Sequence, residues 1–217
     1  MKFLKSSLII FTILFIVVFP HLGVFASISM AYVIPIVLMV WICLRINKEN
    51  FADVGFSFKS FSLKSLLIGS LFAVAIVCFM QGVFFPLLDQ FMQFENVDVE
   101  LYNELRSGGT IYFLIVLVLS WVIGGLYESI VFHGFIFTQL EKLISGKYKT
   151  VISFLITSFL FGAYHFHLGL ADAINAGVVG VGYLALYLFY DRNLWYTIIC
   201  HCVYNTIVIT LLHLGYI

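Results

Sequence analysis

Charged residues are scarce in this sequence. Asp, Glu, Lys and Arg together make up 10% of its 217 residues, whereas they make up about 25% of an average soluble domain. Hydrophobic residues reach 63%, and the mean hydropathy is +1.10. A larger core in a soluble domain would not account for this excess, so the chain is predicted to be an integral protein of the lipid bilayer. The 11 basic and 11 acidic residues cancel, which argues against a nucleic-acid-binding protein.

Cysteine and proline are also rare. None of the four cysteines forms a CxxC pair and all lie in apolar runs, which favours buried free thiols over disulfides or metal ligands. The cysteines are Cys43, Cys78, Cys200 and Cys202. Pro35 and Pro86 fall within or near the end of apolar runs, where neighbouring helices can satisfy the carbonyl groups that proline leaves free. No internal repeat is visible, which counts against an inverted-repeat transporter.

Long apolar runs, by contrast, fill most of the chain. A membrane-spanning helix needs about 20 apolar residues, and seven runs are candidates: 6–25, 28–44, 65–87, 111–140, 150–167, 172–190 and 193–214. The first run resembles a secretory signal, with Val24-Phe25-Ala26 as a cleavage site, but a second run follows at once and we expect the first to be retained. The predicted fold class is therefore all-α, a polytopic transmembrane helix bundle of about seven spans.

The basic residues predict how these spans are oriented. With the N-terminus inside, ten of the eleven basic residues fall on the inner side and only Arg106 falls on the outer side. The inner residues are Lys2, Lys5, Arg45, Lys48, Lys59, Lys64, Lys142, Lys147, Lys149 and Arg192. This positive-inside pattern predicts a cytoplasmic N-terminus and an external C-terminus. Small basic loops without a soluble domain suggest a multi-pass protein of a bacterial plasma membrane.

Three other stretches have a recognisable character. Stretch 49–64 alternates aromatic and charged residues, and is expected either to lie along the cytoplasmic interface or to form a short loop with buried aromatics. Segment 88–110 is acidic, and is either a solvated loop or an external cap that gates a substrate. Small residues are dense in 176–182, which predicts close helix packing and a central place for the sixth span.

Four polar residues interrupt the later apolar runs. They are Glu128, His165, His201 and Asn205. An ionisable group at the centre of a membrane helix costs about 2.5–3.5 kcal/mol, so it indicates a functional site. One shared polar cavity is the simplest way to satisfy all four groups. His201 and Asn205 lie four residues apart, and so share a helix face, as do Phe161 and His165.

A carboxylate, two imidazoles and an amide suit hydrolysis. The carboxylate can act as a general base towards water, a histidine can hold the water, and neutral N–H groups can stabilise an oxyanion. Alternatively, Glu128, His165 and His201 can supply the three protein ligands of a catalytic zinc ion. The HExxH signature is absent. Both the metal-independent and the zinc interpretation stay open at this point.

The motifs that carry these residues resemble a known family. Phe161-Gly162-Ala163-Tyr164-His165 and His201-Cys202-Val203-Tyr204-Asn205 match the FxxxH and HxxxN motifs of the CPBP group of intramembrane proteases, and Glu128 begins a variant of its EExxxR motif. This group includes the type II CAAX prenyl endopeptidases and the bacterial Abi proteins. The resemblance implies that residues 49–217 form a catalytic core behind two N-terminal helices, residues 1–48. It further implies that Glu128 and His165 activate water, that His201 and Asn205 stabilise the oxyanion, and that the substrate is a membrane-embedded peptide or protein.

The first motif departs from the family pattern. Ser129 stands in place of the second Glu, and His133 in place of the Arg. Losing both charges leaves no unpaired charge, so one hypothesis is that Ser129 and His133 form a neutral replacement for the pair. The alternative is a catalytically degenerate relative that acts as a bacteriocin-immunity or regulatory membrane protein.

Overall fold

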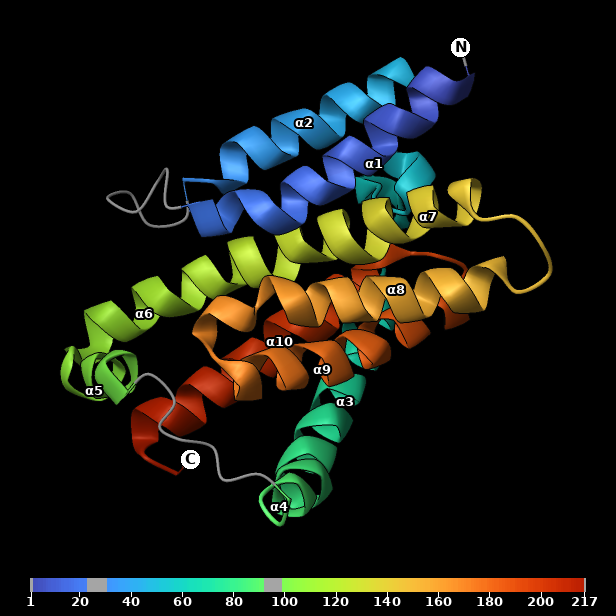
Figure 1. Ribbon diagram of the computed structural model, residues 1–217. Helices are drawn as coiled ribbons and strands as arrows, with labels where there is room; N and C mark the ends of the chain where they lie inside the picture. Colours follow the sequence, from blue (N-terminus) through green and yellow to red (C-terminus); the bar gives the residue numbers. More distant parts are fainter. Residues whose placement is uncertain (1, 23–30, 92–98, 217) are drawn as a thin grey trace.

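The protein consists of helices joined by short turns. The computed structural model describes residues 2–22, 31–91 and 99–216, and within these ranges it contains no strand (Figure 1). The first half holds α1 (Lys2–Val18), η1 (Phe19–Leu22), α2 (Val33–Ile46), η2 (Phe51–Val54), η3 (Phe58–Ser60), α3 (Leu63–Phe79), η4 (Met80–Phe84), α4 (Phe85–Leu88) and α5 (Val99–Ser107). The second half holds α6 (Gly109–Ser120), η5 (Trp121–Ile136), α7 (Phe137–Leu143), α8 (Lys149–Tyr164), η6 (Phe166–Leu168), α9 (Leu170–Phe189) and α10 (Leu194–Leu214). The predicted all-α fold class is confirmed.

Among the residues that the structure describes, six helices are long and apolar enough to cross a membrane. They are Phe3–Leu22, Leu63–Leu88, Gly109–Leu143, Lys149–Leu168, Leu170–Phe189 and Leu194–Leu214. The remaining predicted span, residues 28–44, corresponds to α2, which has only 14 residues. A helix of this length extends about 21 Å at 1.5 Å per residue. This is shorter than the hydrocarbon core of about 30 Å, so α2 crosses only part of that thickness as a helix. It lies beside α1 in Figure 1, and the two helices contact each other.

Helix α10 occupies the centre of the bundle. It contacts α3, η5 and α9, and also α5 and α6. The close packing predicted for the small-residue helix α9 is confirmed against α8, where a Cβ on Gly162 would meet the Ala173 carbonyl oxygen at 2.7 Å and the Gly177 Cα at 3.2 Å. Helix α9 itself contacts α8, α10 and η5, in agreement with the central position predicted for it.

The helix that carries Glu128 departs from α geometry. Helices α6, η5 and α7 follow one another without a break from Gly109 to Leu143, and Trp121–Ile136 is a π-helix. Its backbone N–H groups bond five residues back instead of four, a geometry that is rare and is found mostly at functional sites. The first motif therefore lies on a helix of unusual register.

Stretch 49–64 holds the turn between α9 and α10. It forms η2 and η3, and Gly55 between them adopts a left-handed conformation with φ of 91°. The Gly55 carbonyl accepts the Leu194 N–H at 3.0 Å, and the Trp195 indole N–H donates to the Ser57 carbonyl at 2.7 Å. The stretch is a loop of short helical turns, but the buried aromatics expected for it are not observed, because Phe58 is 78% and Phe61 is 48% exposed. Through these bonds the stretch fixes the start of α10.

The acidic segment 88–110 forms α5 beside the other end of α10. The Arg106 Nε–H donates to the Leu212 carbonyl at 3.2 Å, and His213 Nδ1 lies 2.7 Å from the Leu105 carbonyl oxygen. Residues 92–98 of this segment lie outside the described ranges, as does the Val24-Phe25-Ala26 sequence. The gating role stays a prediction.

Candidate active site

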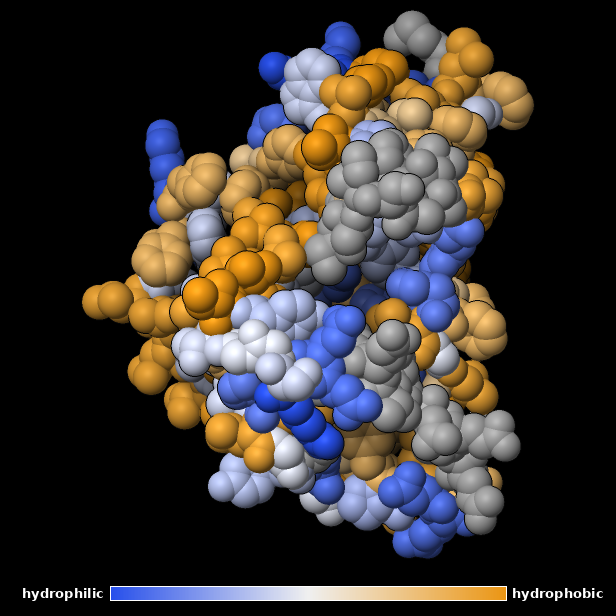
Figure 2. Space-filling view, turned by 90° about the vertical axis from the view of Figure 1, so that its left-hand side faces the viewer, coloured by the Kyte–Doolittle hydropathy of each residue, from blue (hydrophilic) through white to orange (hydrophobic). Residues whose placement is uncertain are grey.

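A cavity of about 580 Å³ opens between α6, η5, α8, α9 and α10. Pockets for small ligands measure about 300–1,000 Å³, so it has room for several substrate groups. All four predicted site residues line it: Glu128, His165, His201 and Asn205. Figure 2 views the end of the molecule where α6 and α9 begin, and hydrophilic side chains gather in the middle of that face. The predicted convergence on one polar cavity is thus observed.

Glu128 lies between the two imidazoles. Its side chain extends from η5 and the residue is 7% exposed. Glu128 Oε2 lies 3.8 Å from His165 Nε2 and 3.9 Å from His201 Nε2. These separations are too long for direct hydrogen bonds, but they suit one water molecule shared between the carboxylate and an imidazole.

His165 has a defined orientation and tautomer. It caps the C-terminus of α8, and its Nδ1 lies 2.8 Å from the carbonyl oxygen of Phe161, one turn earlier. A carbonyl oxygen only accepts hydrogen bonds, so Nδ1 carries a proton, and Nε2 of the neutral ring presents a lone pair towards Glu128. The prediction that Phe161 and His165 share a face is confirmed, and their rings lie 4.7 Å apart.

His201 and Asn205 form the opposite wall of the reactive region. The His201 ring lies against the Tyr183 ring, with centroids 4.5 Å apart and an angle of 31°. The Asn205 amide N–H donates to the Ser120 carbonyl at 3.3 Å, which leaves its second N–H free to point elsewhere. Gly124 makes room for the pair, since a Cβ there would lie 2.6 Å from Asn205 Nδ2 and 3.4 Å from His201 Nε2.

Ser129 and His133 do not form the predicted neutral pair. Both are fully buried. Within the described residues, the Ser129 hydroxyl and both His133 ring nitrogens have no hydrogen-bond partner. The His133 ring instead packs edge-on against Phe161 and Tyr183, at 5.0 Å and 5.4 Å between centroids. Ser129 and His133 are therefore not joined by a hydrogen bond, and His133 interacts with its neighbours through ring packing.

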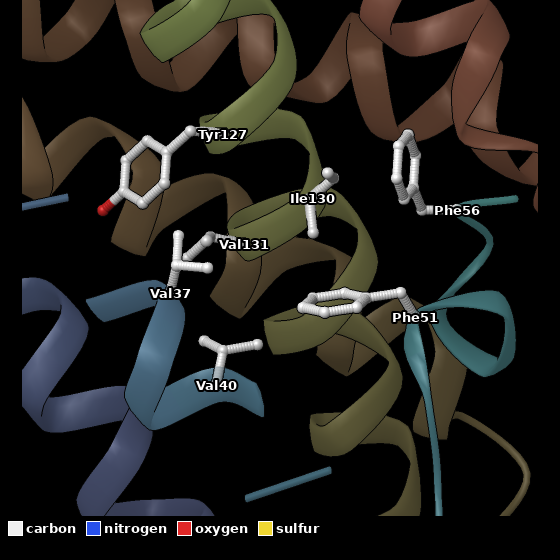
Figure 3. Close-up of a pocket in the computed structure, with 7 residues that line it drawn as sticks. All are labelled: Val37, Val40, Phe51, Phe56, Tyr127, Ile130 and Val131. Atoms are coloured by element: carbon white, nitrogen blue, oxygen red, sulfur yellow. The ribbon is translucent and has the colours of Figure 1, made fainter. Parts of the chain in front are cut away.

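A second cavity lies on another side of η5 and has a different character. It measures about 140 Å³ and lies between η5, α2 and the η2 region (Figure 3). Its lining consists of Val37, Val40, Phe51, Phe56, Tyr127, Ile130 and Val131. None of these side chains is an acid or base suited to proton transfer near neutral pH. The chemistry therefore belongs to the larger cavity.

The sequence interpretation did not assign several polar or small residues of the larger cavity to the site, and it placed one of them, His167, at a span boundary. Gly124, His167, Asp172 and Asn175 all line it. The Tyr204 hydroxyl donates to Asn175 Oδ1 at 3.3 Å. Two signals were available: a glycine one turn before the buried acid, and an aspartate and an asparagine three residues apart at the start of an apolar run.

The described residues do not fit a metal centre. They contain no group of three His, Cys, Asp or Glu side chains arranged to hold a metal ion. Catalytic zinc sites use three protein ligands, and Glu128, His165 and His201 are not arranged as such a set in this structure.

Comparison with known proteins supports the motif interpretation. Residues 110–207 match the family described as type II CAAX prenyl endopeptidase Rce1-like. The matched range runs from α6 into α10 and contains all three motifs. No curated protein and no solved structure matches the chain. Residues 110–207, which hold Glu128, His165, His201 and Asn205, are thus similar to the Rce1-like family of type II CAAX prenyl endopeptidases.

Proposed function

We propose that the protein is an intramembrane endopeptidase that cleaves a membrane-associated peptide or protein with water activated by Glu128 and His165. The family supports CAAX-type endopeptidase activity in general. The observation that carries the specific proposal is the position of the Glu128 carboxylate, with an imidazole nitrogen at 3.8 Å and another at 3.9 Å inside a membrane cavity. This arrangement has the groups that peptide hydrolysis needs.

In the first step, water bonds to Glu128 and to the lone pair of His165 Nε2. Glu128 takes a proton from the water as the oxygen attacks the peptide carbonyl carbon, and a tetrahedral intermediate with an oxyanion forms. His165 holds the second hydrogen of the water, because its Nδ1–H is engaged by the Phe161 carbonyl and its Nε2 accepts. Glu128 thus deprotonates the water, and His165 orients it.

In the second step, the oxyanion is stabilised from the other wall. The free N–H of Asn205 and an N–H of His201 donate to it. The proton on Glu128 then passes to the peptide nitrogen as the C–N bond breaks, releasing an amine and a carboxylic acid. Glu128 returns to its starting state, and no external reactant other than water is consumed.

The test uses purified protein in lipid vesicles and a panel of internally quenched transmembrane peptides. Glu128→Gln is expected to lower kcat by about 10²–10⁴-fold, the usual contribution of a general base. Asp89→Asn is the control, because Asp89 is an exposed carboxylate and is not among the cavity lining residues. Wild-type cleavage that survives Glu128→Gln would refute the proposed chemistry.

The main rival is a non-catalytic relative with a regulatory or bacteriocin-immunity role, motivated by Ser129 and His133. It predicts that no peptide of the panel is cleaved and that Glu128→Gln preserves the cellular phenotype.

The membrane location is multi-pass. We propose a bacterial plasma membrane as the setting, with the basic end of the bundle in the cytoplasm.

A further inference from the structure

The large cavity contains acidic side chains but no basic ones of permanent charge. Among the side chains lining it, Glu128 and Asp172 are the carboxylates, and the described lysines and arginines all lie elsewhere. Residues 23–30 and 92–98, outside the described ranges, contain no lysine or arginine. Arg106, on the neighbouring α5, donates to the Leu212 carbonyl and does not line the cavity. A bound substrate therefore meets a cavity with acidic charge.

Asp172 lies on the α9 side of this cavity. It belongs to the first turn of α9, and Asn175 follows on the same face three residues later. Asp172 forms no ion pair with any described residue. Asn175 Oδ1 accepts from the Tyr204 hydroxyl, so its amide N–H₂ group remains as a donor beside the carboxylate. His167, which also lines the cavity, interacts with the Asp172 carboxylate electrostatically without forming an ion pair. Asp172 and Asn175 thus present hydrogen-bonding groups with no lysine or arginine beside them in the cavity lining.

We infer that Asp172 is a specificity-determining residue: the cavity selects peptides that carry a cationic group, a lysine or arginine side chain or a free amine, near the scissile bond. The same charges disfavour a substrate whose C-terminal carboxylate has to lie in the cavity. Such a carboxylate would otherwise be stabilised by the helix dipole at the start of α9, but Asp172 already places a carboxylate in that turn. Asp172 is partly buried, so its attraction and repulsion are stronger than between charges fully exposed to water.

This inference rests on the proposed function, and it concerns the substrate. An endopeptidase with this cavity cleaves bonds inside a chain, away from a free C-terminus, and favours membrane peptides with a basic flank. A substrate cut a few residues from its free carboxylate would need a basic side chain to receive that carboxylate, or donors free of acidic neighbours. The described cavity offers no such basic side chain.

The experiment compares one quenched transmembrane peptide in versions with Lys, Gln or Glu next to the cleaved bond. A further pair places that bond three residues from a C-terminus that is either a free carboxylate or an amide. For wild type we expect kcat/KM to fall at least about tenfold from Lys to Glu, and the amide to be cleaved faster than the carboxylate. Asp172→Asn should remove most of this preference, and Asp172→Lys should reverse it.

Asp89→Asn and Asp89→Lys are matched controls, because Asp89 is exposed and does not line the cavity. Equal cleavage of the Lys and Glu peptides by wild type, or an unchanged preference in a folded Asp172→Asn variant, would overturn the inference while leaving endopeptidase activity established. Binding of the same fluorescent peptides to Glu128→Gln gives a readout that does not need turnover. A charge preference in binding without any cleavage by wild type would support the selectivity of Asp172 and refute the proposed hydrolysis.

Discussion

Replacing Gly124 with alanine tests the geometry of the oxyanion wall. The added Cβ would lie 2.6 Å from Asn205 Nδ2, whereas ordinary contacts begin at 3.4 Å. The amide must therefore move by about 0.8 Å, or η5 must move away from α10 by a similar distance. Either movement changes how Asn205 faces the substrate carbonyl, while the distance to His201 Nε2, 3.4 Å, requires only a slight adjustment.

The expected effect is larger on catalysis than on stability. A displacement of about 1 Å can lower a rate about 10²-fold, and losing one oxyanion donor costs about 10²–10³-fold in kcat. Alanine in place of glycine stabilises a helix by about 1 kcal/mol, while overpacking costs about 1–3 kcal/mol. The free energy of unfolding should therefore fall by no more than about 2 kcal/mol, and kcat by about 10²-fold.

The assay is peptide cleavage in vesicles together with thermal unfolding in detergent. Gly82→Ala is the matched control, because a Cβ on Gly82 meets no atom within 4 Å; it should leave kcat unchanged. A Gly124→Ala variant with kcat within twofold of wild type would refute the assignment of Asn205 to the oxyanion. A variant that loses its fold and its activity together would refute the claim that the alanine acts mainly on the site.

Two further predictions concern the scaffold. Gly55→Ala should lower the free energy of unfolding by about 1–3 kcal/mol, because φ of 91° is strained for alanine and its Cβ would meet the Arg192 carbonyl; an unchanged unfolding temperature would contradict the role of Gly55 in holding α10. Ser129→Glu alone should destabilise the protein by about 3–5 kcal/mol, because it buries a carboxylate without a partner. Adding His133→Arg should recover part of that loss, and thermal unfolding of the single and double variants measures the recovery.

The fold class and the convergence of the four candidate residues on one cavity were predictable because both depend on the cost of polar groups in lipid. Apolar runs of sufficient length identify spans, and an ionisable group inside a run needs partners. Glu128, His165 and His201 each meet that condition, and the Asn205 amide is a polar group that also needs a partner, so their convergence followed from three separate runs. The family prediction used the same residues and is confirmed over residues 110–207.

Other features leave no signal in hydropathy. The π geometry of Trp121–Ile136 could not be predicted, because an almost entirely apolar segment has no polar face from which a period can be measured. The length of α2 was overestimated because composition does not say where a helix begins. The contacts of Gly55 with the α9–α10 turn join residues more than 130 positions apart, and a single sequence does not show such pairings. Asp172 was not predicted as a site residue because it stands at the end of an apolar run, where a charged side chain can reach the membrane interface at little cost.

The altered first motif is compatible with retained hydrolysis. Ser129 and His133 replace two opposite charges with two neutral groups, so neither leaves an uncompensated charge in the bundle. His133 packs edge-on against Phe161, whose carbonyl accepts from His165, and against Tyr183, whose ring supports His201. His133, which stands in the place of the family arginine, thus contacts the two residues that position His165 and His201. None of the four groups that face the cavity needs a charge at position 133. This packing supports both imidazoles without the charges of the family motif, so the altered motif does not by itself argue for the non-catalytic relative, and the comparison of wild type with Glu128→Gln distinguishes the two functions.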